Sequence, residues 1–126
     1  MYPYLLVAIG GALGSVARYG TGVLVGKVWD STFPLATMLI NVAGSLAMGL
    51  FIGYLVRTTP GWQADGRLFV AIGVLGGFTT FSSFSLDAIS MLERGDVGPA
   101  LFYVVGSVVI GLAALFGGLV VMRAGA

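Results

Sequence analysis

The chain has 126 residues, of which 58% are hydrophobic and only 9% are charged, and its mean hydropathy is +1.04. A soluble domain of this length needs more surface charge, so the composition predicts an integral membrane protein. The net charge of +1 does not suggest a nucleic-acid partner. The lack of cysteine and histidine argues against thiolate, transition-metal and general-base chemistry, so we do not expect an enzyme.

Four apolar segments follow one another along the chain, at residues 4–25, 35–56, 68–92 and 99–122. At about 1.5 Å of rise per residue, each is long enough to cross a hydrocarbon core of ~30 Å as a helix. The connectors are short and carry most of the charge. The pattern predicts an all-α membrane protein in which residues 1–126 form a single four-helix transmembrane domain.

The first segment combines small residues at fourfold spacing with one arginine. Gly10 and Gly14 allow helix backbones to approach closely, and the 21 glycines of the chain favour oligomerisation. Arg18 lies inside the segment, where an unpaired charge is costly. Two interpretations are open: the side chain snorkels to the membrane surface, or it is a fixed positive charge at the mouth of an anion path.

The second segment holds Asn41, the only asparagine of the chain. A lone amide within a membrane helix usually bonds to a neighbouring helix. Its two N–H groups can equally replace part of the water shell of an anion. The sequence leaves both roles open.

The third segment contains Gly76 and Gly77 in its middle, followed by five hydroxyl side chains and three phenylalanines within residues 76–85. Paired glycines favour an unwound backbone, whose freed carbonyls can bind a cation where protein or a cavity covers them. The alternative is a continuous helix whose small residues only pack against neighbours.

Two phenylalanines, Phe81 and Phe84, are three residues apart and share one face of a helix. They are either ordinary packing residues or rings whose positive edges meet a small anion. They alternate with Ser82, Ser83 and Ser85, which is unusual for a face that contacts lipid or core.

The fourth segment contains Tyr103 and Ser107, which are four residues apart and therefore form one polar face. Asp87, near the end of the third segment, is either an entrance residue or a solvated acid.

The flanking charges barely favour one orientation in the membrane. Three arginines lie on the side of the termini and two basic residues lie on the other side: Arg57, Arg67 and Arg123 against Lys27 and Arg94. A difference of one is too small for the positive-inside rule to fix the topology. Two copies in opposite orientations can therefore pair as an antiparallel dimer.

Three stretches together resemble the Fluc/CrcB family of fluoride ion channels: residues 10–19, residues 37–44 around Asn41, and residues 73–85, which include GGFTTFSSFS. Two departures stand out, because Ser83 replaces a common threonine and Asp87 a common glutamate. Ser83 keeps the hydroxyl group. The shorter Asp87 leaves an entrance role of this acid open.

The resemblance implies a dual-topology homodimer of four-helix subunits in the cell membrane, surrounded by lipid, whose third helix is broken mid-membrane. It further implies passive fluoride export that protects the cytoplasm from fluoride toxicity, and a structural Na⁺ on the dimer axis. The residues implied are Gly76 and Thr79 (sodium, through their carbonyls), Asn41, Phe81, Phe84, Ser82, Ser83, Tyr103 and Ser107 (fluoride pathway), and Arg18 (anion attraction at the vestibule).

The main alternative is a small dual-topology, proton-coupled multidrug exporter. Such an exporter needs a carboxylate inside its first span, whereas the first span here has Arg18 instead. A third possibility is a structural membrane subunit without transport of its own.

Overall fold

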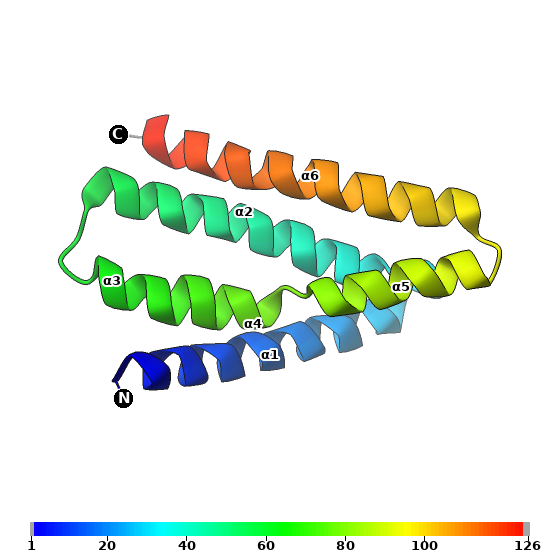
Figure 1. Cartoon of the computed structure of the whole chain (residues 1–126), viewed down its shortest axis with the longest axis horizontal. Helices are drawn as coiled ribbons and strands as arrows, with labels where there is room; N and C mark the ends of the chain where they lie inside the picture. Colours follow the sequence, from blue (N-terminus) through cyan, green and yellow to red (C-terminus); the bar gives the residue numbers. More distant parts are fainter. Residues whose placement is uncertain (1, 125–126) are drawn as a thin grey trace.

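The computed structural model describes residues 2–124, and in this part of the chain all regular elements are helices (Figure 1). The all-α prediction is therefore confirmed. In chain order the elements are α1 (Tyr2–Val28), α2 (Leu35–Thr58), α3 (Gln63–Gly66), the π-helix η1 (Arg67–Leu75), α4 (Gly76–Phe78), α5 (Phe81–Glu93) and α6 (Val97–Ala124).

Three helical stretches of the described chain are long and apolar enough to cross a membrane, namely Leu35–Thr58, Gln63–Glu93 and Val97–Ala124. α1 is longer than α2, with 27 residues against 24, but Arg18, Lys27 and several glycines lower its hydropathy. The first of the four predicted spans, residues 4–25, thus stays a prediction. The chain runs back and forth along one long axis, with both termini and the α2–α3 connector at the same end (Figure 1).

The helices pack in two sets, α1 against η1 and α4, and α2 against α6. Glycines at the crossings make this possible. A Cβ atom on Gly14 would overlap the carbonyl oxygen of Val74, and one on Gly49 would overlap that of Leu115. The small residues predicted to allow close helix contact therefore act within one chain.

The third apolar stretch consists of two helices joined by an extended linker. The first helical run ends at Phe78, Thr79 and Thr80 are extended with ψ angles of 157° and 120°, and α5 begins at Phe81. Thr80 caps α5, because its side-chain oxygen accepts a hydrogen bond of 3.1 Å from the Ser83 amide. The linker separates the paired glycines from the phenylalanine pair.

Candidate ion site at the helix break

Asn41 binds the backbone of the linker through both ends of its amide. Its Nδ2 donates to the Thr80 carbonyl oxygen at 3.0 Å, and its Oδ1 accepts from the Thr80 amide at 2.8 Å. The interhelical role considered for this residue is therefore present. One Nδ2 hydrogen remains beyond the bond to Thr80, so donation to an anion is still chemically possible.

The hydrogen bonds between Asn41 and Thr80 change which backbone carbonyls near the break accept a hydrogen bond. In a continuous α-helix the Thr80 amide would donate to Gly76 and the Ser83 amide to Thr79. Here the first amide donates to Asn41 and the second to the Thr80 hydroxyl oxygen. The carbonyl oxygens of Gly76 and Thr79 have thus lost their helical donors. The Phe78 carbonyl is released in the same way by the end of the helix.

Arg18 forms a hydrogen bond with the Gly77 carbonyl, which is the remaining carbonyl of this turn. Its Nε donates to the Gly77 carbonyl oxygen at 3.1 Å, and the bond is partly buried. The guanidinium group therefore lies at the break and does not extend to the end of α1. A half-buried arginine there is stabilised by the end of a helix, where partial negative charge accumulates.

Two hollows border the break. The first, of about 280 Å³, is lined by Asn41, Gly44, Ser45, Met48, Thr79, Thr80, Phe81 and Leu115. The second, of about 290 Å³, is lined by Arg18, Tyr19, Gly22, Val23, Ala36, Thr37, Ile40, Thr80 and Ser83. Thr80 contributes to both, so the linker forms the wall between them.

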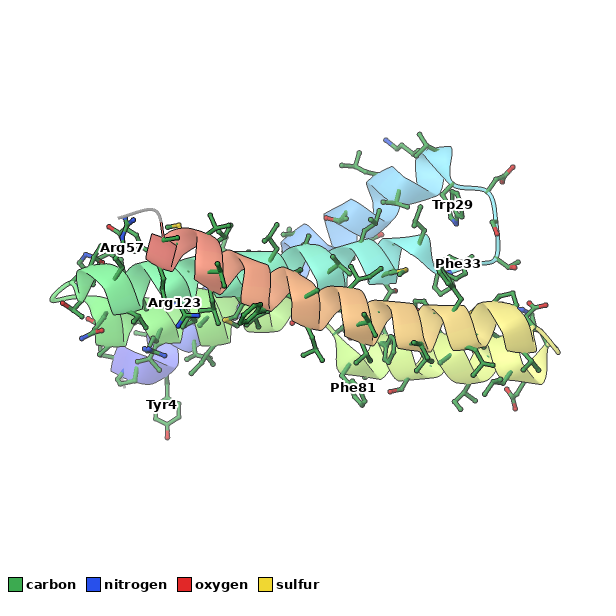
Figure 2. All side chains as sticks on the ribbon, turned by 90° about the horizontal axis from the view of Figure 1, so that it is seen from above. Tyr4, Trp29, Phe33, Arg57, Phe81 and Arg123 are labelled. Carbon is green, nitrogen blue, oxygen red and sulfur yellow. The ribbon has the colours of Figure 1, made fainter. Side chains whose placement is uncertain are left out.

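Phe81 and Phe84 lie in the first turn of α5. The ring centroids of Phe81 and Phe84 are 5.9 Å apart, and the ring of Phe84 lies 5.0 Å from that of Tyr103. Phe81 is 79% exposed and points away from the helices of its own chain (Figure 2). Ser82 is exposed as well, with its Oγ 3.4 Å from that of Thr80. One ring of the pair is therefore available to a partner, and the other is held within the chain.

Tyr103 and Ser107, the two α6 residues predicted to form a polar face, are buried. Tyr103 belongs to a core cluster with Met38, Ala88, Met91 and Ala100, and its hydroxyl donates to Asp87 Oδ2 at 3.2 Å.

Ser107 is also buried, and its Oγ has no hydrogen-bond partner among the described residues. Tyr103 and Ser107 share the inner face of α6, as predicted, but neither lines the two hollows.

Of the residues that sequence reasoning selected, the structure brings Asn41, Thr79 and Phe81 to one hollow, and Arg18 and Ser83 to the other. Sequence reasoning did not predict this grouping. It missed three roles, those of the Thr80 backbone, of the Gly77 carbonyl and of Asp87 as the acceptor for Tyr103. The position of Thr80 directly before an amphipathic helix is a capping signal that could have indicated the first. The contact of Asp87 with Tyr103 joins two different helices, and no sequence pattern points to it.

The oxygen atoms left open at the break are suitable ligands for a monovalent hard cation. The open groups are carbonyl oxygens, which suit ions of the sodium type. The described residues contain no group of three or more histidine, cysteine, aspartate or glutamate side chains that could hold a metal. Two of the three open carbonyls, those of Gly76 and Thr79, are the ones that the resemblance implies.

Comparisons with known proteins give this geometry its context. Residues 5–119 match the family described as CrcB-like protein, Camphor Resistance (CrcB). The chain belongs to the CrcB family. With its long apolar helices, this CrcB chain is a multi-pass membrane protein.

Curated relatives of the CrcB chain cover nearly its full length. A protein of Nitrobacter hamburgensis named fluoride-specific ion channel FluC 2 is 48% identical, over 95% of this chain and 96% of its own. The fluoride-specific ion channel FluC of Paracoccus denitrificans is 49% identical, over 97% and 95%. That of Thermus thermophilus is 48% identical, over 92% and 91%.

Proposed function

We propose that this protein is a fluoride-selective channel of the cell membrane that lets fluoride leave the cytoplasm, and that it is not an enzyme. The observation that carries the proposal is the 48–49% identity, over nearly the whole chain, to relatives named fluoride-specific ion channels. The geometry at the break agrees with this function, because hydrogen-bond donors and aromatic residues line the two hollows.

Fluoride is small and strongly hydrated, so a pathway must replace its water with donors. Asn41 offers the second hydrogen of its Nδ2 group, and Ser82 and Ser83 offer hydroxyl groups. The rings of Phe81 and Phe84 offer positive edges in a passage too narrow for a larger anion. Tyr103 and Ser107 are assigned to the pathway from the resemblance, although both are buried on α6 outside the two hollows; the Ser107 hydroxyl has no hydrogen-bond partner among the described residues and could donate to the ion. The charge of Arg18 attracts the anion towards the second hollow.

The pathway needs a second copy of the chain. Phe81 is 79% exposed, and the first hollow is open at the surface of the single chain. A Cβ atom on Gly76 would meet only the Ala71 carbonyl oxygen, at 3.6 Å, so the chain itself does not require glycine there. We infer an antiparallel homodimer of four-helix subunits in which the break lies mid-membrane and each pore has walls from both copies.

A sodium ion on the two-fold axis completes the proposal. The Gly76 and Thr79 carbonyl oxygens of each copy would hold it, since their helical donors are bonded elsewhere. When bound, the ion supplies the positive charge that offsets the repulsion among converging carbonyl dipoles in a low dielectric. Its role is structural.

Flux from liposomes tests the function directly. Purified protein is reconstituted into vesicles loaded with potassium fluoride, a potassium ionophore is added, and fluoride release is followed with an electrode. Matched vesicles loaded with potassium chloride are the selectivity control. Release of fluoride but not chloride is expected. Proton-coupled cation uptake would indicate the exporter, and no flux of any kind would indicate a structural subunit.

A further inference from the structure

Side chains from two other helices decide which backbone carbonyls of the break remain open. Arg18 of α1 binds the Gly77 carbonyl at 3.1 Å, and Asn41 of α2 binds Thr80 through two hydrogen bonds, at 2.8 and 3.0 Å. These bonds join residues 59 and 39 positions apart, so they fix the linker relative to the rest of the chain. We propose that Arg18 and Asn41 are positioning residues for the cation site.

The bond from Asn41 prevents the helix from continuing. Without it, the Thr80 amide is free to return to the Gly76 carbonyl, which is its partner in a continuous helix. A glycine-rich turn has little intrinsic preference to stop at one position. Asn41 therefore keeps the Gly76 carbonyl open by binding the competing donor.

The bond from Arg18 removes the neighbouring carbonyl from the set of possible ligands. Gly77 is next to Gly76, and a free carbonyl there would offer a cation an alternative position. A Cβ atom on Gly77 would lie 2.7 Å from the Gly11 carbonyl oxygen, so α1 also confines this turn by close packing. The guanidinium group and the packing act on the same peptide unit.

Electrostatics alone predicts the opposite role for Arg18. A guanidinium group one residue from a cation site repels the cation, and this repulsion is strong where water is scarce. If Arg18 acted only through its charge, its removal would tighten sodium binding. If Arg18 positions the backbone, its removal weakens sodium binding. The sign of the change therefore distinguishes the two roles.

The experiment measures sodium affinity for the wild type, Arg18→Gln and Asn41→Leu. Radioactive sodium binding and the sodium dependence of the melting temperature of detergent-purified protein are the two readouts. Arg18→Gln removes the hydrogen bond of a charged donor to Gly77, and Asn41→Leu removes two partly buried hydrogen bonds to Thr80, so sodium affinity should fall roughly ten- to a hundredfold. Arg123→Gln is the matched control, because Arg123 also donates to a backbone carbonyl, but this carbonyl belongs to its own helix and the bond is exposed, so no change is expected.

Arg18→Lys keeps the charge and a donor, so it should fold and have an intermediate affinity. If Arg18→Gln does not fold, the sodium affinity of Arg18→Lys still tests the positioning role of Arg18. Unchanged or tighter sodium binding in Arg18→Gln, together with unchanged binding in Asn41→Leu, would overturn the proposal. An Arg18→Lys protein that binds sodium as tightly as the wild type would also contradict the positioning role of Arg18.

The inference rests on the proposed cation site, and a second measurement separates the two. Amide hydrogen exchange at residues 76–81 in sodium-free buffer reports on the linker without the ion. A changed exchange rate of the Thr80 amide is expected in Asn41→Leu, because this amide loses the Asn41 acceptor and is free to bind the Gly76 carbonyl instead. A wild type that binds no sodium would refute the cation site, whereas equal exchange in variant and wild type would refute the positioning role.

Discussion

Phe81→Ile and Phe84→Ile should separate conduction from stability, because the two rings have different surroundings. Isoleucine keeps an apolar side chain of similar size but removes the positive ring edge. Both variants should lose most fluoride flux if the edges contact the ion. Only one of them should lose much stability.

The expected difference follows from the ring pairs. Phe81 pairs with one ring, that of Phe84, whereas Phe84 pairs with both Phe81 and Tyr103. At about 0.5–1.5 kcal/mol for each aromatic pair, Phe81→Ile should cost about 0.5–1.5 kcal/mol and Phe84→Ile about 1–3 kcal/mol. In the single chain Phe81 is 79% exposed, so its replacement leaves little empty space.

The assay combines fluoride release from liposomes with thermal unfolding in detergent, on the same preparations. Phe81→Ile should remain a folded dimer with a near-normal melting temperature and severely reduced flux. Conduction at the parental rate in Phe81→Ile would refute the role of the ring edge at this position and assign coordination to the hydroxyl groups. A larger loss of stability in Phe81→Ile than in Phe84→Ile would contradict the packing argument.

Other predictions concern packing, a buried hydrogen bond and topology. Gly14→Ala should reduce the yield of folded protein or destabilise it by about 1–3 kcal/mol through overlap with the Val74 carbonyl, while Gly26→Ala, with open space around its Cβ position, should be neutral or slightly stabilising in thermal unfolding. In a double-mutant cycle, Asp87→Ala and Tyr103→Phe should show a coupling free energy of about 1.5–3 kcal/mol, and additive effects would mean that their hydrogen bond contributes nothing. A tag at the C-terminus should be accessible from both sides of the membrane, and a tag seen on one side alone would refute the antiparallel dimer.

The helices were predictable from the sequence because apolar length determines membrane spans. The segments predicted at 35–56 and 99–122 agree with α2 and α6 within a few residues. The paired glycines Gly76 and Gly77 predicted an unwound backbone in this segment, but both lie in the helix α4, and the extended linker follows them. Its exact place, at Thr79 and Thr80, depends on Asn41 and on the Thr80 cap, and the first of these is a contact between helices.

The candidate site was only partly predictable, because its key bonds join distant residues. A charged Arg18 and an amide Asn41 within apolar segments marked both residues as candidate site residues. Their backbone partners, Gly77 and Thr80, lie 59 and 39 positions away. Both side chains act on carbonyl and amide groups that every residue possesses. A sequence pattern identifies an unusual side chain and does not show which common backbone group it binds.

Asn41 links the two ions of the proposed mechanism. Its Oδ1 and one Nδ2 hydrogen hold Thr80 and so keep the Gly76 carbonyl open, and the second hydrogen remains for fluoride. Asn41→Asp would place a carboxylate against both the Thr80 carbonyl oxygen and the anion, so flux should be abolished for two reasons at once. Asn41→Leu removes the donors without adding charge. If sodium binding depends on the bond between Asn41 and the Thr80 amide, Asn41→Leu should lose sodium affinity, whereas Asn41→Asp should retain more of it, because its carboxylate can still accept from this amide. If only the anion contact matters, both should lose flux while sodium binding remains intact.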